Sequence, residues 1–227
     1  MSKRYFAIGL GTAAVFMSGV ASAFCSAPPP KVCSAYFQAD VVVRGKVLSV
    51  QRNADWIHYK ISIEKTFKGQ QLPTRYFDTG NDSGRLSLDA GAKYVLFAYR
   101  NDNRLEIGCD EEPLSDPSKV AVVSAEIERL QASKQTFAII EGEVLAADYS
   151  SPLPGVSVVA TGLGGIHRVV SNNKGLFSMR VPPGLYSVHV APNIVEQTIY
   201  SEIYTNPESI HLEPGQCAQL QYAGVRR

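Results

Sequence analysis

Residues 56–64 read WIHYKISIE, and large apolar side chains occupy every second position from Ile57 to Ile63. The positions between them carry polar or amphipathic side chains, beginning with Trp56 and His58. Successive side chains of a β-strand point to opposite faces, so this period of two predicts a strand with one face on a core and the other exposed. The same kind of signal dominates the rest of the chain, and we predict an all-β protein.

Short runs rich in β-branched and aromatic residues alternate with turn-forming residues along the chain. In the first half, further strands are expected at 40–50, 74–79, 94–99 and 104–109. Gly45 is a candidate bulge within the first of them. In the second half, strands are expected at 137–146, 156–160, 167–171, 176–181, 185–191, 197–203, 209–212 and 216–222. Their spacing, with breakers such as Pro182-Pro183-Gly184 between them, is typical of a β-sandwich.

One helix is predicted, starting after residue 116. Asp116 supplies a capping side chain, Pro117 suits the first turn, and apolar residues follow at helical spacing as far as Leu130. Residues 132–135 then form a short linker. Because about 200 residues suit two domains of ~100 residues each, we expect this linker to join two domains.

The first 23 residues have the pattern of an export signal. Lys3 and Arg4 precede an uncharged run at 5–17, and residues 21–23 are the small residues of a cleavage site. The alternative, a retained membrane helix, requires ~20 apolar residues, and this run is shorter. We therefore expect a signal peptide at 1–23, a mature chain that begins at Phe24, no membrane span after cleavage, and a secreted or periplasmic location.

Charge and cysteine content narrow the partners further. Cleavage removes two of the 22 Lys and Arg residues and none of the 21 Asp and Glu residues, so the mature chain is nearly neutral. That balance gives no electrostatic reason to expect nucleic acid as a partner.

The chain has four cysteines, Cys25, Cys33, Cys109 and Cys217. In an exported chain an even number favours two disulfides, and because the spacings of a zinc site are missing, we expect no metal and no cofactor. Spacing alone does not choose among the three pairings.

The second half resembles the carboxypeptidase regulatory-like family of transthyretin-type sandwiches. The resemblance is carried by the blocks at 140–144, 153–158, 173–178 and 181–188. It implies a seven-stranded sandwich over 135–227. The family is mostly structural or adhesive, and some relatives of similar shape bind glycans.

The first half resembles the netrin-like, OB-type barrel of the tissue inhibitors of metalloproteinases. The resemblance is carried by Cys25 with the prolines after it, and by the blocks at 39–47, 66–69, 79–80, 91–98 and 105–109. It implies a five-stranded barrel with a C-terminal helix over 24–134. It also implies a disulfide between Cys25 and Cys109, which leaves Cys33 and Cys217 to pair across the two domains.

The start of the mature chain departs from the inhibitor pattern. Those inhibitors begin with a Cys-x-Cys whose first cysteine binds the catalytic zinc of the protease through its free amino group and carbonyl. Here Phe24 precedes Cys25, and Ala27 stands in place of the second cysteine. Zinc chelation by the family's route is therefore not expected, although the arm formed by Phe24, Cys25, Pro28, Pro29 and Pro30 remains a candidate partner-binding segment.

Trp56 and His58 are the remaining candidates for a binding site. Trp56 is the only tryptophan, and by alternation it shares the exposed strand face with His58 and Lys60. An exposed indole there would stack on a sugar or pack on a partner. The alternative is a covering role, with Trp56 closing a barrel end or packing on the sandwich.

The sequence shows no catalytic set. The four histidines are scattered without an HExxH arrangement, and residues 155–159 lack the final glycine of a serine nucleophile elbow. We therefore expect an exported, non-catalytic binding or structural protein of the cell envelope, with adhesion or carbohydrate binding as its role and a protein or glycan as its partner. The alternative is a metalloprotease inhibitor.

Peptide mapping tests the bridge that the resemblance implies. Digestion of the mature protein without reduction should yield a disulfide-linked peptide pair that contains Cys25 and Cys109. Cys33 and Cys217 should be found together in a second linked pair. A linked pair of Cys25 and Cys33 would contradict this assignment.

Overall fold

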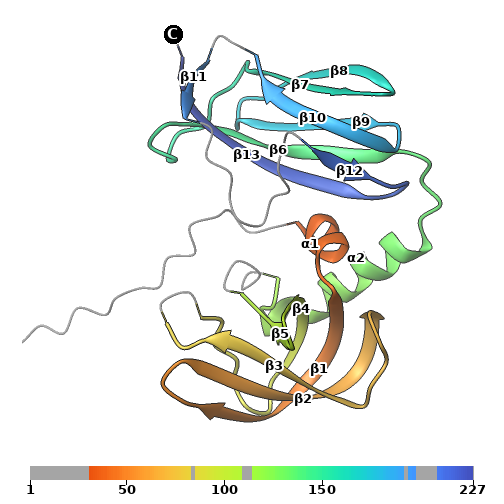
Figure 1. Cartoon of the computed structure of the whole chain (residues 1–227), viewed down its shortest axis with the longest axis vertical. Coiled ribbons are helices and arrows are strands. Elements are labelled where there is room, and N and C mark those ends of the chain that lie inside the picture. Colours follow the sequence, from red (N-terminus) through yellow and green to blue (C-terminus); the bar gives the residue numbers. More distant parts are fainter. Residues whose placement is uncertain (1–30, 83–84, 109–113, 192–193, 198–208, 227) are drawn as a thin grey trace, which may run out of the picture.

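The computed structural model describes residues 31–82, 85–108, 114–191, 194–197 and 209–226, and these residues are mostly β-strand. Figure 1 shows a barrel and a sandwich at opposite ends, with two helices between them. The all-β class predicted from the sequence is confirmed. Among the described residues, no helix is long and apolar enough to cross a membrane.

The first half forms a closed five-stranded barrel. Its strands are β1 (Val41–Arg52), β2 (Trp56–Lys68), β3 (Thr74–Gly80), β4 (Lys93–Asn101) and β5 (Arg104–Glu106). They are ordered β1-β2-β3-β5-β4 around the barrel, and every neighbouring pair is antiparallel except β3 and β5. The last strand ends at Glu106, earlier than the 104–109 expected. Alternation along β2 holds, because Ile57, Tyr59 and Ile61 are fully buried in the barrel core.

Gly45 marks one of three register shifts between β1 and β2. A Cβ atom at this position would lie 2.5 Å from the carbonyl oxygen of Ser62 on the neighbouring strand. Only glycine therefore allows the two backbones to approach this closely, which lets the long strand curve around the barrel. The bulge predicted from the sequence is confirmed.

The second half forms two packed four-stranded sheets. The strands are β6 (Ala138–Ala146), β7 (Ser157–Gly162), β8 (Gly165–Val170), β9 (Leu176–Val181), β10 (Gly184–Val190), β11 (Ile194–Gln197), β12 (Ile210–Leu212) and β13 (Cys217–Arg226). The sheet orders are β12-β10-β7-β8 and β11-β13-β6-β9. Their inner faces bury one apolar core that includes Ile140, Phe177 and Tyr186. The described part of the sandwich thus has eight strands, the number that the strand pattern of the sequence predicted and one more than the family resemblance implied.

Two helices cover one side of the barrel. The predicted helix is present as a 3₁₀ turn (Pro117–Lys119) continued by α2 (Val120–Ala132), and the Asp116 side chain caps it by accepting from the Ser118 N–H. The structure adds a shorter helix, α1 (Val32–Gln38), which the sequence does not signal. Seven residues without a capping side chain are too few for a stable isolated helix, so packing must supply the stability of α1.

The helices and the outer face of the barrel share a second apolar cluster. Val123 and Ile127 of α2 pack there with Ala35 of α1, against Val42 of β1 and Phe97 of β4. All five residues are buried. The outer face of β1 and β4 is therefore closed to solvent at this point.

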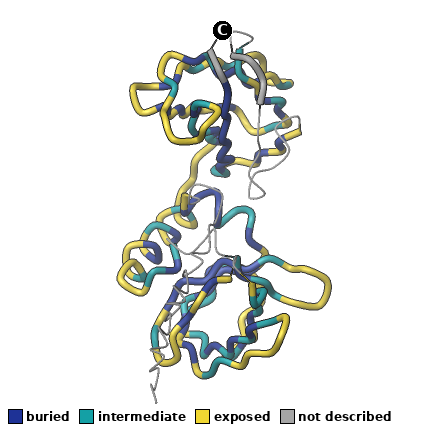
Figure 2. The backbone as a smooth tube through the Cα atoms, turned by 90° about the vertical axis from the view of Figure 1, so that its left-hand side faces the viewer, coloured by how far each residue is buried: buried dark blue, intermediate teal, exposed yellow. Residues whose placement is uncertain are grey.

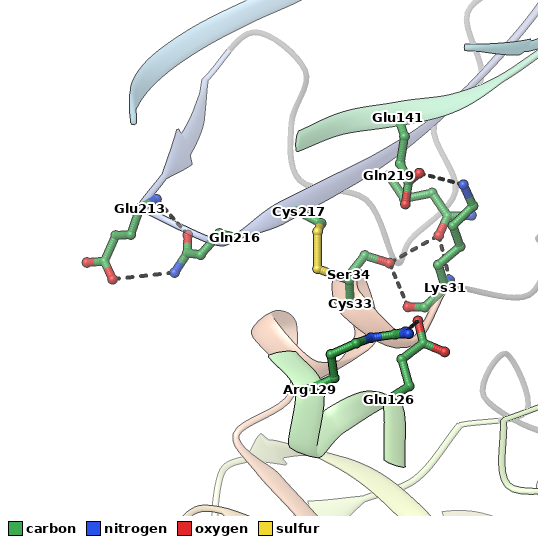
Figure 3. Close-up of a disulfide and its surroundings, with 10 residues drawn as sticks. All are labelled: Lys31, Cys33, Ser34, Glu126, Arg129, Glu141, Glu213, Gln216, Cys217 and Gln219. Atoms are coloured by element: carbon green, nitrogen blue, oxygen red, sulfur yellow. Dashed lines mark hydrogen bonds and ion pairs between the residues drawn. A yellow bond between two sulfur atoms is a disulfide. The ribbon is translucent and has the colours of Figure 1, made fainter. Parts of the chain in front are cut away.

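The other side of α1 is joined to the sandwich. Cys33 forms a disulfide with Cys217 at the start of β13, with their Cα atoms 5.8 Å apart (Figure 3). Beside the disulfide, the Oε1 atom of Gln219 accepts hydrogen bonds from the Lys31 N–H at 2.7 Å and from the buried Ser34 hydroxyl at 3.1 Å. The Lys31 ammonium also pairs with Glu141 of β6 at 2.5 Å. The Cys33–Cys217 bridge expected from the sequence is confirmed, while Cys25 and Cys109 lie outside the described residues.

Proteolysis under two redox conditions tests this connection. Residues 133–135, between α2 and β6, are all exposed, as Figure 2 shows, so we expect trypsin to cut at Lys134. The products should stay together without reduction, because the Cys33–Cys217 bridge spans the cut, and should separate when reductant is added.

A matched pair of variants separates the Cys33–Cys217 bridge from the predicted Cys25–Cys109 bridge. The double substitution Cys33→Ala and Cys217→Ala should release the fragments without reductant, whereas Cys25→Ala with Cys109→Ala should not. Separation of the wild-type fragments on a non-reducing gel would contradict the connection.

Candidate functional site

The structure describes two of the candidate binding residues. Phe24, Cys25, Pro28, Pro29 and Pro30 lie outside the described residues, so the binding role of the arm stays a prediction. Trp56 and His58 lie on β2, and both side chains are partly exposed.

The pairing of β2 with β3 defines the face that carries these two side chains. Trp56 lies opposite Gly80, His58 opposite Asp78, and Lys60 opposite Tyr76. The alternate residues of β2 point into the barrel, so these pairs lie on its outer face.

Trp56 packs against an arginine from a different strand. The guanidinium carbon of Arg104, on β5, lies 4.3 Å from the centroid of the indole ring, within the range of a cation–π contact. The Nε atom of Arg104 lies 3.9 Å from Asp78 Oδ2. Arg104 therefore links the tryptophan to the carboxylate on β3 and restricts the orientation of the indole.

Asp78 also holds His58. The Nδ1 atom of His58 lies 2.7 Å from Asp78 Oδ1, and its Nε2 atom lies 3.2 Å from the side-chain nitrogen of Asn53. With Nδ1–H donated to the carboxylate, Nε2 accepts from the amide of Asn53. Both ring nitrogens are thus engaged, and the histidine has a positioning role within this network.

Asn53 shapes the turn between β1 and β2. Its side-chain oxygen accepts the N–H of Asp55 at 2.9 Å and the N–H of Trp56 at 2.7 Å. This is an Asx turn, in which a short polar side chain replaces backbone partners. The same side chain therefore fixes the start of β2, where Trp56 lies, and contacts His58.

A cavity of about 260 Å³ opens beside the indole. It is lined by Trp56, Asn101, Asp102, Asn103, Arg104 and Glu106. Five of these six residues come from the β4–β5 hairpin, where Asn101 Nδ2 donates to Glu106 Oε1 at 3.1 Å. The cavity combines one large aromatic ring with amide, carboxylate and guanidinium groups, which is the mixture of apolar surface and placed polar groups found in small-molecule sites.

A second cavity, of about 330 Å³, lies at Tyr94 and Asp116. Its polar groups serve the fold, because the Tyr94 hydroxyl accepts the N–H of Asp89 at 3.0 Å and Ser115 donates to the carbonyl of Val95. Hydrogen bonds from the hydroxyl and the N–H of Ser118 hold the pKa of Asp116 below its ordinary value. This cavity is therefore a weaker candidate than the one at Trp56.

Metal binding finds no support in the described part of the chain. There, no three His, Cys, Asp or Glu side chains gather in a position to hold a metal ion.

The comparisons with known proteins do not assign a function to this chain. No protein-family model matches the chain, and no curated protein matches it. Among solved structures it is similar to the Bacillus anthracis TIE protein, at 10% sequence identity and a TM-score of 0.32. The match covers 83% of this chain and 31% of that one, so the chain spans less than a third of its length. A likeness this weak carries no argument about function.

The sequence predicted some residues of the cavity and of the hydrogen-bond network beside it, and missed the others. Trp56 and His58 were found because alternation along one strand is visible locally. Asp78, Arg104 and Glu106 were not, because they join the site through the parallel pairing of β3 with β5, between segments far apart in the sequence. The outward alternation of Arg104 and Glu106 was the only local signal.

Quenching of tryptophan emission tests the stacked pair directly, because the chain has a single tryptophan. In Arg104→Ala, one face of the indole loses its cover, so acrylamide should quench Trp56 more strongly than in the wild type. Arg104→Lys should fall between the two, since an ammonium lacks the planar stacking surface. Arg168→Ala, on the sandwich, is the control, and equal quenching in all four proteins would contradict the contact.

Proposed function

We propose that this chain is an exported, non-catalytic binding protein of the cell envelope whose barrel binds carbohydrate at Trp56. The observation that carries the proposal is the cavity of about 260 Å³ in which the only tryptophan faces amide and carboxylate side chains. A secreted or periplasmic location belongs to the same proposal, and the Cys33–Cys217 disulfide supports it because such bonds persist in oxidising compartments.

The lining of the cavity suits the chemistry of a sugar. A sugar ring has apolar C–H faces and a rim of hydroxyl groups that both donate and accept hydrogen bonds. The indole of Trp56 offers a flat surface for the apolar face. Asn101 and Asn103 offer donors and acceptors, and the carboxylates of Asp102 and Glu106 offer strong acceptors for hydroxyl groups.

The place of the cavity on the barrel supports the same proposal. Barrels of the OB type bind oligosaccharides and oligonucleotides over strands 2 and 3 and the loops that connect strands 1–2 and 4–5. Here the lining residue Trp56 follows the β1–β2 turn, and Asn101–Asn103 lie at the β4–β5 turn. An oligonucleotide would require a basic groove along its phosphates, and this cavity has one arginine among two carboxylates.

A non-catalytic role fits the polar side chains beside the cavity, because they are engaged with one another within the fold. His58 supplies the imidazole of the network beside the cavity, and both of its nitrogens are hydrogen-bonded within the fold. Its function there is to hold Asp78, which in turn holds Arg104. We therefore assign these residues to positioning and the cavity to binding.

The inhibitor alternative depends on the arm at 24–30, outside the described residues, and no described residue favours it. Mass spectrometry of the mature N-terminus separates the inhibitor hypothesis from the carbohydrate-binding one. A chain that began at Cys25 would revive the inhibitor mechanism.

Calorimetric titration with uncharged oligosaccharides tests the carbohydrate proposal. Trp56→Ala should weaken binding by about tenfold or more, which corresponds to roughly 1.4 kcal/mol of lost stacking. Leu72→Ala, an exposed apolar residue on the barrel, is the matched control and should bind like the wild type. Equal affinity in the wild type and Trp56→Ala would contradict the proposal.

A further inference from the structure

A second aromatic side chain is exposed on the same face of the barrel. Tyr76, on β3, has 63% of its surface exposed, whereas its neighbours Arg75 and Phe77 are buried in the barrel. The ammonium of Lys60 lies 5.9 Å from the centroid of its ring. A tyrosine held on a strand, with a lysine beside it, offers a flat apolar surface with a polar edge.

The register of the two strands fixes the distance between the aromatic residues. Trp56 lies opposite Gly80 and Tyr76 lies opposite Lys60, so the two rings are offset by four residues along the strands. At ~3.3 Å per residue this offset is about 13 Å. Gly80 presents no side chain beside the indole, and the His58–Asp78 pair lies between the two rings.

We propose that Trp56, the His58–Asp78 pair and Tyr76 form one extended binding strip for a chain of uncharged sugar units. One unit occupies the cavity at Trp56, and a unit further along the chain stacks on Tyr76. The unit between them passes over His58 and Asp78. The proposal rests on the proposed function, and it adds the length and charge of the ligand.

The charges along the strip decide against an acidic polysaccharide. The basic side chains are Lys60 and Arg104, and the acidic ones are Asp78, Asp102 and Glu106. Arg104 is already paired with Asp78 and stacked on the indole, so little positive charge remains for a sulfate or uronate group. A sulfated chain would instead meet the carboxylates of Asp102 and Glu106.

The ligand's length should control the affinity. When one unit is held at Trp56, a unit on the same chain reaches Tyr76 at a high effective concentration, and the second contact adds to the first. A single sugar makes only the first contact. Affinity should therefore rise with chain length until the ligand spans both rings, and then level off.

Titration with β-linked glucose and N-acetylglucosamine oligomers of one to six units tests the strip. In the wild type, affinity for at least one series should rise about tenfold or more from the single sugar to the longest oligomer. Tyr76→Ala should abolish this rise, and Tyr76→Thr should do the same while keeping a residue that favours β-strand. Tyr76→Phe should retain the rise, because the stacking surface remains.

Tyr149→Ala is the matched control, since Tyr149 is another exposed tyrosine and lies in a turn of the sandwich. It should show the same length dependence as the wild type. If affinity does not change with length, or if Tyr76→Ala and Tyr76→Thr both keep the rise, the strip is wrong, although the single site at Trp56 stands. If no uncharged oligomer binds, or if only heparin fragments bind, the strip and the proposed function both fail.

Discussion

The junction built on α1 is the constraint on which the rest of the structure depends. This helix has seven residues and no side-chain cap, so it does not hold itself together. Its buried residues pack with α2 against the barrel, and Cys33 ties it covalently to Cys217 at the start of β13. Gln219 accepts hydrogen bonds from Lys31 and Ser34 beside the disulfide, and these bonds restrict the orientation of β13 relative to α1. The sandwich is thereby attached to a helix that is itself part of the barrel's apolar cluster.

That arrangement also decides which face of the barrel stays open. In an OB-type barrel every strand carries apolar residues on its inner face. Here β1 and β4 also carry apolar residues on their outer face, including Val42 and Phe97. The two helices cover them, and Lys65 of β2 pairs with Glu128 of α2 at the border of this cover. The outer face of β3 and of β2 from Trp56 to Lys60 carries polar and aromatic residues that are exposed or partly exposed. Binding is therefore proposed on the side away from the buried cluster.

The polar groups on the open face are organised before any ligand arrives. Asp78 accepts from His58 and lies beside Arg104, which stacks on Trp56, so one carboxylate orients three side chains from two other strands. Asn53 holds both the turn before Trp56 and the far side of His58. A preorganised surface loses less side-chain entropy on binding, which is how a shallow cavity gains useful affinity. The exposed pairs themselves contribute little to stability, because solvent screens them.

The sequence by itself determined the features that depend on neighbours along the chain. Alternation predicted the strands and placed Trp56 and His58 on one face, and the cap at Asp116 predicted α2. The sequence could not predict α1, whose stability comes from residues far away along the chain. Only the tertiary structure brought Arg104 and Glu106 beside Trp56, because β5 reaches this face through its non-local pairing with β3. Local periodicity fixes which way a side chain points, whereas the neighbours it meets depend on strand order and register, which no short stretch of sequence encodes.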